Sequence, residues 1–410
     1  MQEVRRRVKW ALLLGLAAGL VWVVAPALSM QRYMPRAVDF EQRLPTVVPA
    51  SGDAAPKRLL RARSEAGAGP VSFRSPTIVA PERFDLVGLA GEVRPLEFRG
   101  RESGGTWSDW TETEDGNPVY FGGADELQVR ARGWRPRGRL HYVNVSGTTT
   151  EVGGLLTRVR KAINSGFISA AGVFSPATAE ATPARPKIIT RAAWGATAEH
   201  GGCPPRVKPS YGEVKAATVH HTVTANDYTE EEAPSIVLGI CRYHRNGNGW
   251  NDIGYNALVD NFGNVYQGRA GGIRKAVVGA QAQGFNAQTT GTATIGTHTE
   301  TPITPETRHA LVDYLAWKLS IHGLTAKGKT TMVSAGGEAS RYPAGRRVRT
   351  NKIIGHGTVG LTACPGEALE AEIPKLRRLV QQKIDASGGP TEPPPEDPGG
   401  IIPPPPPVPK

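Results

Sequence analysis

The sequence predicts an α/β fold, with a mixed central β-sheet flanked by helices, preceded by a small all-β domain. Residues 186–383 alternate strand-like and helical patterns, which is typical of an α/β layer fold. Within that stretch, residues 255–260 and 264–267 flank a short turn and predict an antiparallel hairpin, so the sheet should be mixed. Residues 81–147 carry short alternating runs divided by glycine-rich turns, a pattern typical of a small sandwich or barrel.

The amino terminus predicts export. Basic residues between positions 5 and 9 precede an apolar run over residues 10–24, and small residues follow up to position 29. This order is typical of a signal peptide. The apolar run continues weakly to Leu28, near the shortest membrane-spanning length of about 17 residues, so a retained membrane anchor is the alternative. Both forms place the rest of the chain outside the cytoplasm, either secreted or associated with the cell wall.

Three segments are predicted to be connections rather than folded domains. Residues 30–80 form a linker and residues 148–185 a connector, because neither shows a sustained period. Residues 384–410 are a proline-rich, disordered tail, expected to be extended polyproline II.

Charge and cysteine content limit the functional classes. The 410 residues include 49 Lys and Arg against 37 Asp and Glu, a formal charge of +12 that favours anionic partners. Export makes an anionic cell-wall polymer a better candidate than nucleic acid. Three cysteines exclude a disulfide-dense scaffold and a zinc module closed by four cysteines. Outside the cytoplasm, Cys203 and Cys241 are expected to form a disulfide, the alternative being two buried free thiols.

The elements of residues 186–383 follow from their periodicity. Thr304 followed by Pro305 predicts the N-cap and first position of a helix that ends before Gly323. The other predicted helices cover residues 229–245 and 367–381. The predicted strands cover residues 215–222, 255–260, 264–267, 291–297 and 352–355.

Two histidines and one cysteine form a candidate metal site. His220 and His356 both stand at the carboxyl end of a predicted strand, where sites in open sheets gather. Cys364 follows His356 by eight positions and precedes a predicted helix, whose N–H groups would favour its thiolate. Two imidazoles and a thiolate suit Zn²⁺ and leave a fourth position for water, which is the catalytic pattern.

Side-chain alternation separates His220 from its neighbour His221. Along the strand, His221 shares a face with the apolar Ala217 and Val219, and His220 shares the other face with small and polar residues. The apolar face is the natural core side. We therefore expect His220 to be the ligand and His221 to be a packed, hydrogen-bonded histidine.

Residues 186–383 resemble the peptidoglycan recognition protein family and the bacteriophage lysozyme-type amidases. The resemblance rests on five blocks in order: residues 191–196, 219–222, 249–256, 263–269 and 356–366. It implies a zinc-dependent N-acetylmuramoyl-L-alanine amidase, which cuts the amide between the lactyl group of muramic acid and L-alanine. The partners it implies are peptidoglycan and muropeptides. The alternative is a noncatalytic peptidoglycan-binding module.

The resemblance assigns roles to individual residues. His220, His356 and Cys364 match the zinc ligands, and Tyr255 matches the catalytic tyrosine. Its phenol could donate to the oxyanion that forms at the attacked carbonyl. Thr362, two residues before the cysteine, could orient water or substrate.

The resemblance also implies substrate contacts at Arg269, Gln281 and Asn286. Gln281 departs from the family pattern, because relatives often have a histidine there that faces the substrate groove. Glutamine can still hydrogen-bond but cannot become cationic. The departure bears on substrate affinity and preference rather than on metal binding.

Overall fold

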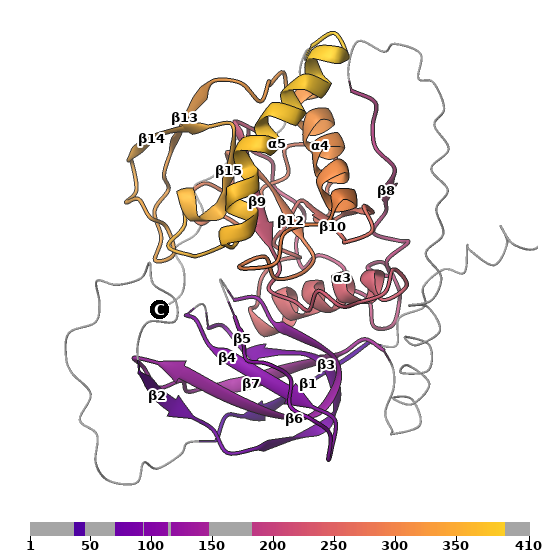
Figure 1. Cartoon of the computed structure of the whole chain (residues 1–410), viewed down its shortest axis with the longest axis vertical. Coiled ribbons are helices and arrows are strands. Elements are labelled where there is room, and N and C mark those ends of the chain that lie inside the picture. Colours follow the sequence, from indigo (N-terminus) through magenta and orange to yellow (C-terminus); the bar gives the residue numbers. More distant parts are fainter. Residues whose placement is uncertain (1–36, 46–69, 93, 114–115, 147–182, 390–410) are drawn as a thin grey trace, which may run out of the picture. The chain divides into compact units, whose positions relative to one another are not determined.

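An antiparallel sheet of seven strands forms the first folded part of the described chain (Figure 1). The computed structural model describes residues 37–45, 70–92, 94–113, 116–146 and 183–389. The strand order is β1-β7-β3-β6-β4-β5, and β2 pairs with β6. The strands are β1 (Val38–Arg43), β2 (Val71–Arg74), β3 (Ile78–Leu89), β4 (Glu97–Arg101), β5 (Thr111–Glu112), β6 (Val119–Arg132) and β7 (Arg139–Asn144). We call this part the β domain.

The β domain begins earlier in the chain than the sequence predicts. The predicted linker, residues 30–80, contains β1, β2 and the start of β3. In β1, Phe40 lies opposite Tyr142 in the register with β7, and their rings stack 4.9 Å apart. Phe40 stands between Asp39 and Glu41, so the short strand β1 contains no apolar run that would predict it. Pairing with a strand about 100 residues later is what orders it.

A six-stranded sheet forms the centre of the second folded part, which we call the α/β part, and this sheet is mixed as predicted. Its order is β15-β9-β12-β10-β11-β8, and only the β10–β11 pair, the predicted hairpin, is antiparallel. The strands are β8 (Ile188–Ile189), β9 (Ala216–His221), β10 (Ala257–Val259), β11 (Val265–Gln267), β12 (Thr289–Thr294) and β15 (Ile353–Gly355). A separate hairpin, β13 (Lys329–Val333) and β14 (Arg347–Asn351), was not predicted, because most of its residues are polar or charged.

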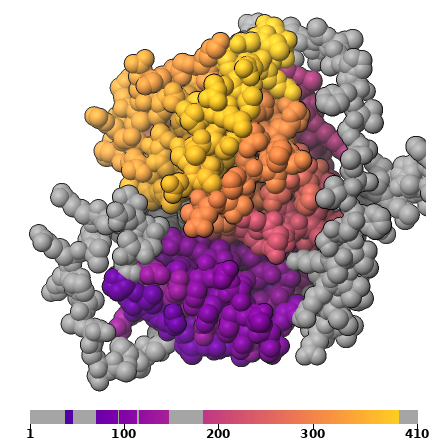
Figure 2. Space-filling view, viewed as in Figure 1, coloured from indigo at the N-terminus to yellow at the C-terminus, as the bar shows by residue number. Residues whose placement is uncertain are grey.

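Helices α4 (Pro305–Ser320) and α5 (Glu367–Ala386) pack on one face of this sheet. Thr304 is the N-cap of α4, as predicted, and its Oγ1 accepts a hydrogen bond from the Thr307 N–H at 3.0 Å. Ala217 and Val219 of β9 belong to the same core as these helices, whereas Ala216 belongs to the core on the opposite face. Figure 2 shows α5, in yellow, at the surface of this part of the chain.

Helix α3 (Ala233–Arg242) and the π-helical turn η1 (Tyr243–Gly247) contact the β domain. The sheets of both parts belong to one compact unit. Arg242 Nε donates to Asp39 Oδ1 at 2.7 Å. A Cβ at Gly88 in β3 would lie 2.2 Å from the Tyr243 hydroxyl, so only glycine permits this approach.

Several predictions concern residues outside the described ranges. The export segment over residues 1–29, nearly all of the connector and most of the tail lie there. Helix α5 continues to Ala386, slightly beyond the predicted domain end at residue 383. Among the described helices, none combines the length and the apolar character needed to cross a bilayer.

Candidate metal centre

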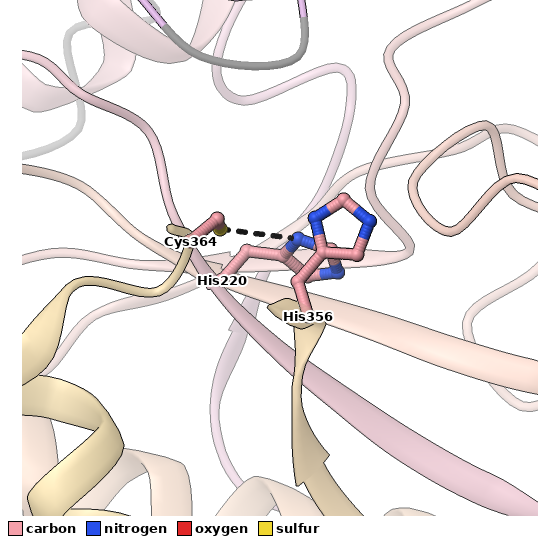
Figure 3. Close-up of side chains that lie close together, drawn as sticks. All are labelled: His220, His356 and Cys364. Atoms are coloured by element: carbon pink, nitrogen blue, oxygen red, sulfur yellow. Dashed lines mark hydrogen bonds between the residues drawn. The ribbon is translucent and has the colours of Figure 1, made fainter. Parts of the chain in front are cut away.

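Two parallel neighbouring strands bring His220 and His356 together. β9 ends at His221, and β15 pairs beside it with Gly355 opposite Val219, so His356 follows β15 next to His220. Their ring centroids lie 4.5 Å apart. Cys364 comes from the loop before α5, and its Sγ lies 3.6 Å from His220 Nδ1 (Figure 3). The structure thus joins the three residues that the sequence singled out.

The donor set fits a zinc ion. One ligand atom from each of the three residues lies within 4.8 Å of the others, and His220, His356 and Cys364 are only 1, 5 and 2% exposed. Burial of the ring is the main cause that lowers the pKa of His220 well below its usual value, and the neighbouring His356 lowers it further. A neutral imidazole is the form that binds metal, and two nitrogens with one sulfur are typical zinc ligands.

A chain of hydrogen bonds fixes which nitrogen of His220 can bind the metal. The Thr289 hydroxyl donates to the Phe285 carbonyl at 2.9 Å, so it accepts from Gln281 Nε2 at 2.8 Å. The Gln281 amide oxygen therefore faces His220 Nε2, at 2.6 Å, and accepts its proton. His220 consequently presents Nδ1, without a proton, toward Cys364. The substrate contact that the resemblance implies for Gln281 stays a prediction, and its side chain supports a candidate ligand.

Replacement of Gln281 by leucine should lower zinc affinity about 10- to 100-fold, because it removes the group that orients His220. The variant leaves the His220 Nε2–H without its acceptor in a buried position. Competition with a chromophoric chelator measures the affinity. Gln283→Leu, an exposed glutamine of the same loop, is the matched control and should bind zinc as the wild type does. Equal affinities for all three proteins would contradict the role of Gln281.

Tyr255 lies beside the candidate ligands, just before β10. Its ring centroid is 5.3 Å from that of His220 and 5.7 Å from that of His244 in η1. The phenol donates to the side-chain oxygen of Asn117, 2.9 Å away, and His244 Nε2 lies 3.0 Å from the same oxygen. Neither Asn117 nor His244 was predicted from the sequence. Asn117 belongs to the β domain and carries no local signal, and His244 lies in a π-helical turn within a predicted helix.

Thr362 holds the backbone that presents Cys364. Its Oγ1 accepts a hydrogen bond from the Cys364 N–H at 3.0 Å. Thr362 and Cys364 also line a groove of about 1170 Å³, together with Arg341, Glu367 and Glu370. The groove gives a candidate substrate direct access to the cysteine side of the site.

Arg269 and Asn286 bind the backbone of neighbouring loops. The Arg269 guanidinium donates to the carbonyl oxygens of Ile253 and Val278. Asn286 Oδ1 accepts from the N–H groups of Gln281 and Ala282, each at 2.8 Å. These bonds shape the loops next to the site, and neither residue is among those that line the groove. Their substrate contacts stay a prediction.

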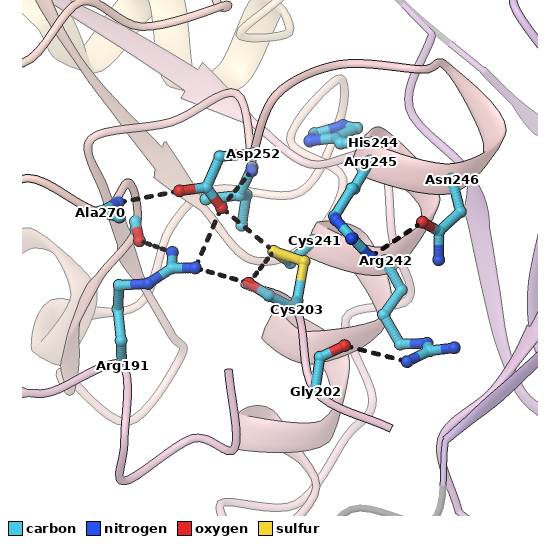
Figure 4. Close-up of a disulfide and its surroundings, with 12 residues drawn as sticks. Arg191, Gly202, Cys203, Cys241, Arg242, His244, Arg245, Asn246, Asp252 and Ala270 are labelled. Atoms are coloured by element: carbon cyan, nitrogen blue, oxygen red, sulfur yellow. Dashed lines mark hydrogen bonds and ion pairs between the residues drawn. A yellow bond between two sulfur atoms is a disulfide. The ribbon is translucent and has the colours of Figure 1, made fainter. Parts of the chain in front are cut away.

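Cys203 and Cys241 form a disulfide, with their Cα atoms 6.2 Å apart (Figure 4). It ties the loop before β9 to α3. The buried pair Arg191 and Asp252 lies beside it, with 3.1 Å between Arg191 Nη2 and Asp252 Oδ1. Asp252 and the two cysteines also cluster closely enough to suggest a metal site, but both thiols are used in the disulfide.

Comparisons with known proteins match the part of the chain that carries this site. Residues 210–367 match the family described as N-acetylmuramoyl-L-alanine amidase. Over 190 residues, the chain is 31% identical to peptidoglycan-recognition protein SC2 of Drosophila melanogaster, covering 45% of this chain and 84% of the relative. A mutant of Drosophila PGRP-LB in complex with tracheal cytotoxin is 23% identical, with 45% of this chain and 92% of that chain covered and a TM-score of 0.35. An N-acetylmuramoyl-L-alanine amidase of Clostridium intestinale is 22% identical, with 47% of this chain and 97% of that chain covered and a TM-score of 0.33.

Proposed function

Because this chain belongs to the peptidoglycan-recognition protein and amidase family, we propose that it is a zinc-dependent N-acetylmuramoyl-L-alanine amidase. It hydrolyses the amide between the lactyl group of N-acetylmuramic acid and L-alanine in peptidoglycan. The observation that carries the proposal is the convergence of His220, His356 and Cys364, whose ligand atoms lie within 4.8 Å of one another, beside Tyr255. These three residues would hold zinc, which when bound supplies Lewis-acid chemistry to the carbonyl and to water.

The surrounding residues have separate tasks in this reaction. Tyr255 donates a hydrogen bond to the carbonyl oxygen as negative charge develops on it. Gln281 keeps Nδ1 of His220 free of a proton, and Thr362 fixes the turn that presents Cys364. Burial of the ligands excludes bulk water and strengthens each of these electrostatic contacts.

The partner we propose is peptidoglycan or its soluble muropeptides. The proteins similar to this chain include a peptidoglycan-recognition protein and a protein in complex with tracheal cytotoxin. The groove beside Cys364 offers room for such a ligand, and its charged lining can hydrogen-bond polar groups. Export by the amino-terminal segment and attraction of the +12 chain to anionic wall polymers belong to the same proposal.

A noncatalytic peptidoglycan-binding module is the second candidate. It is favoured by the name of the SC2 relative, which describes recognition rather than cleavage. The two candidates differ in the product: the amidase releases free stem peptide, whereas the binding module leaves the muropeptide intact.

Incubation of the full chain with purified muropeptides tests the choice. We expect zinc-loaded protein to release stem peptides, and we expect a chelator to stop the release until zinc is restored. Mass spectrometry of the products distinguishes the lactyl–alanine cut from cuts within the peptide. Saturable binding without product, in the presence of zinc, would support the binding module and reject the amidase.

A further inference from the structure

The side-chain carbonyl oxygen of Asn117 accepts two hydrogen bonds inside the candidate site. One comes from the Tyr255 hydroxyl at 2.9 Å and the other from His244 Nε2 at 3.0 Å. Asn117 belongs to the β domain, in the turn between β5 and β6, and the other two residues belong to the α/β part. All three side chains are buried, with Asn117 only 5% exposed.

The direction of both hydrogen bonds follows from their neighbours. The Gly254 N–H donates to His244 Nδ1 at 3.1 Å, so the proton of the neutral ring is on Nε2. Burial keeps the ring neutral by lowering the pKa of His244 to about 3. A carboxamide oxygen has no proton to give. His244 and Tyr255 therefore both donate, and Asn117 is the acceptor.

Two donors that converge on one amide oxygen are what an amide hydrolase needs at its scissile bond. Donors placed in this way stabilise the negative charge that develops on the carbonyl oxygen during attack. Tyr255 already has this task in the proposed reaction, and the ring of His220 lies beside it. Asn117 carries the same functional group as the scissile amide, and its side-chain oxygen accepts a hydrogen bond from both donors.

Gly116, next to Asn117, is held by a contact to the α/β part outside the two donors. Asn248 Nδ2 donates to the Gly116 carbonyl at 2.7 Å. Gly116 has a φ of +75°, and a Cβ there would lie 3.1 Å from Asn248 Nδ2, so glycine suits both the turn and the close approach. Farther away, the carboxylate of Asp39 in β1 accepts hydrogen bonds from the side chains of Arg242 and Asn246.

We propose that Tyr255 and His244 form a two-donor site for the carbonyl oxygen of the scissile amide, and that Asn117 blocks this site as an internal stand-in for the substrate. The proposal rests on the amidase function given above. It makes His244 a second catalytic donor and the β domain an autoinhibitory module. Substrate gains the two donors only when Asn117 withdraws, so its apparent affinity is the intrinsic affinity multiplied by the fraction of molecules in which Asn117 has withdrawn.

Replacement of Asn117 tests the proposal through binding and hydrolysis separately. Calorimetry measures muropeptide affinity in metal-free protein, and product release measures hydrolysis in zinc-loaded protein. Asn117→Ala and Asn117→Leu should both tighten binding about tenfold, since neither offers an acceptor to the two donors. Hydrolysis at low substrate concentration should rise by a similar factor. Asp109→Ala, an exposed position in the same domain, is the control and should change neither quantity.

A second variant loosens the β domain without touching the donors. Asp39→Ala removes the acceptor of Arg242 and Asn246 and should also tighten muropeptide binding. Unchanged or weaker binding in both Asn117 variants and in Asp39→Ala would overturn the proposal. Tighter binding with no hydrolysis by any variant would support the blocked carbonyl site and reject only the amidase function.

Discussion

His220→Ala should abolish stoichiometric zinc binding and hydrolysis, whereas His221→Ala should retain both. Loss of one of three protein ligands should weaken zinc binding by a factor on the order of 10³. His221 points to the other side of β9, where its Nδ1 accepts a hydrogen bond from the His298 N–H at 3.0 Å. His221→Ala leaves that buried donor without its acceptor, so we expect a loss of about 1–3 kcal/mol in the free energy of unfolding.

Elemental analysis of dialysed protein and denaturant unfolding measure the two effects. The adjacent histidines form a matched pair, since both are buried and both come from one strand. Equal loss of zinc in the two variants would contradict the assignment of opposite roles. So would full zinc occupancy in His220→Ala.

Tyr255→Phe should lower kcat about 10²- to 10³-fold while zinc content stays unchanged. The substitution removes one hydrogen-bond donor to the developing oxyanion and keeps the ring that packs beside His220. The same hydroxyl holds Asn117 in place. The variant should therefore release Asn117 more easily, so substrate binding should not weaken in proportion to kcat.

Steady-state kinetics that separate kcat from KM, with zinc analysis of the same samples, test this prediction. Tyr266→Phe is a suitable control, because that buried tyrosine donates to Asp260 at 2.8 Å and takes no part in the site. A Tyr255→Phe enzyme with wild-type kcat would remove the tyrosine from the proposed mechanism.

Local patterns were sufficient to predict much of the α/β part. Thr304 and Pro305 define the start of α4 by their own chemistry, and the hairpin of β10 and β11 follows from two apolar runs around a turn. The alternation along β9 assigned His220 and His221 to opposite faces, and the two cores agree, since Ala217 and Ala216 pack on opposite sides of the sheet. Each of these features depends on residues close together in the chain.

The mixed sheet, the starts of α4 and α5 and the identity of the three converging side chains follow from the sequence, whereas α3 begins at Ala233 rather than at the predicted residue 229. Three features emerge only in the folded protein: β1 completes the β domain, Gln281 fixes the tautomer of His220, and Asn117 reaches Tyr255 and His244. The reason is separation along the chain: Asn117 and Tyr255 are 138 residues apart. Hydrogen-bond partners at such distances leave no periodic pattern in either segment, and they form only when the core has packed.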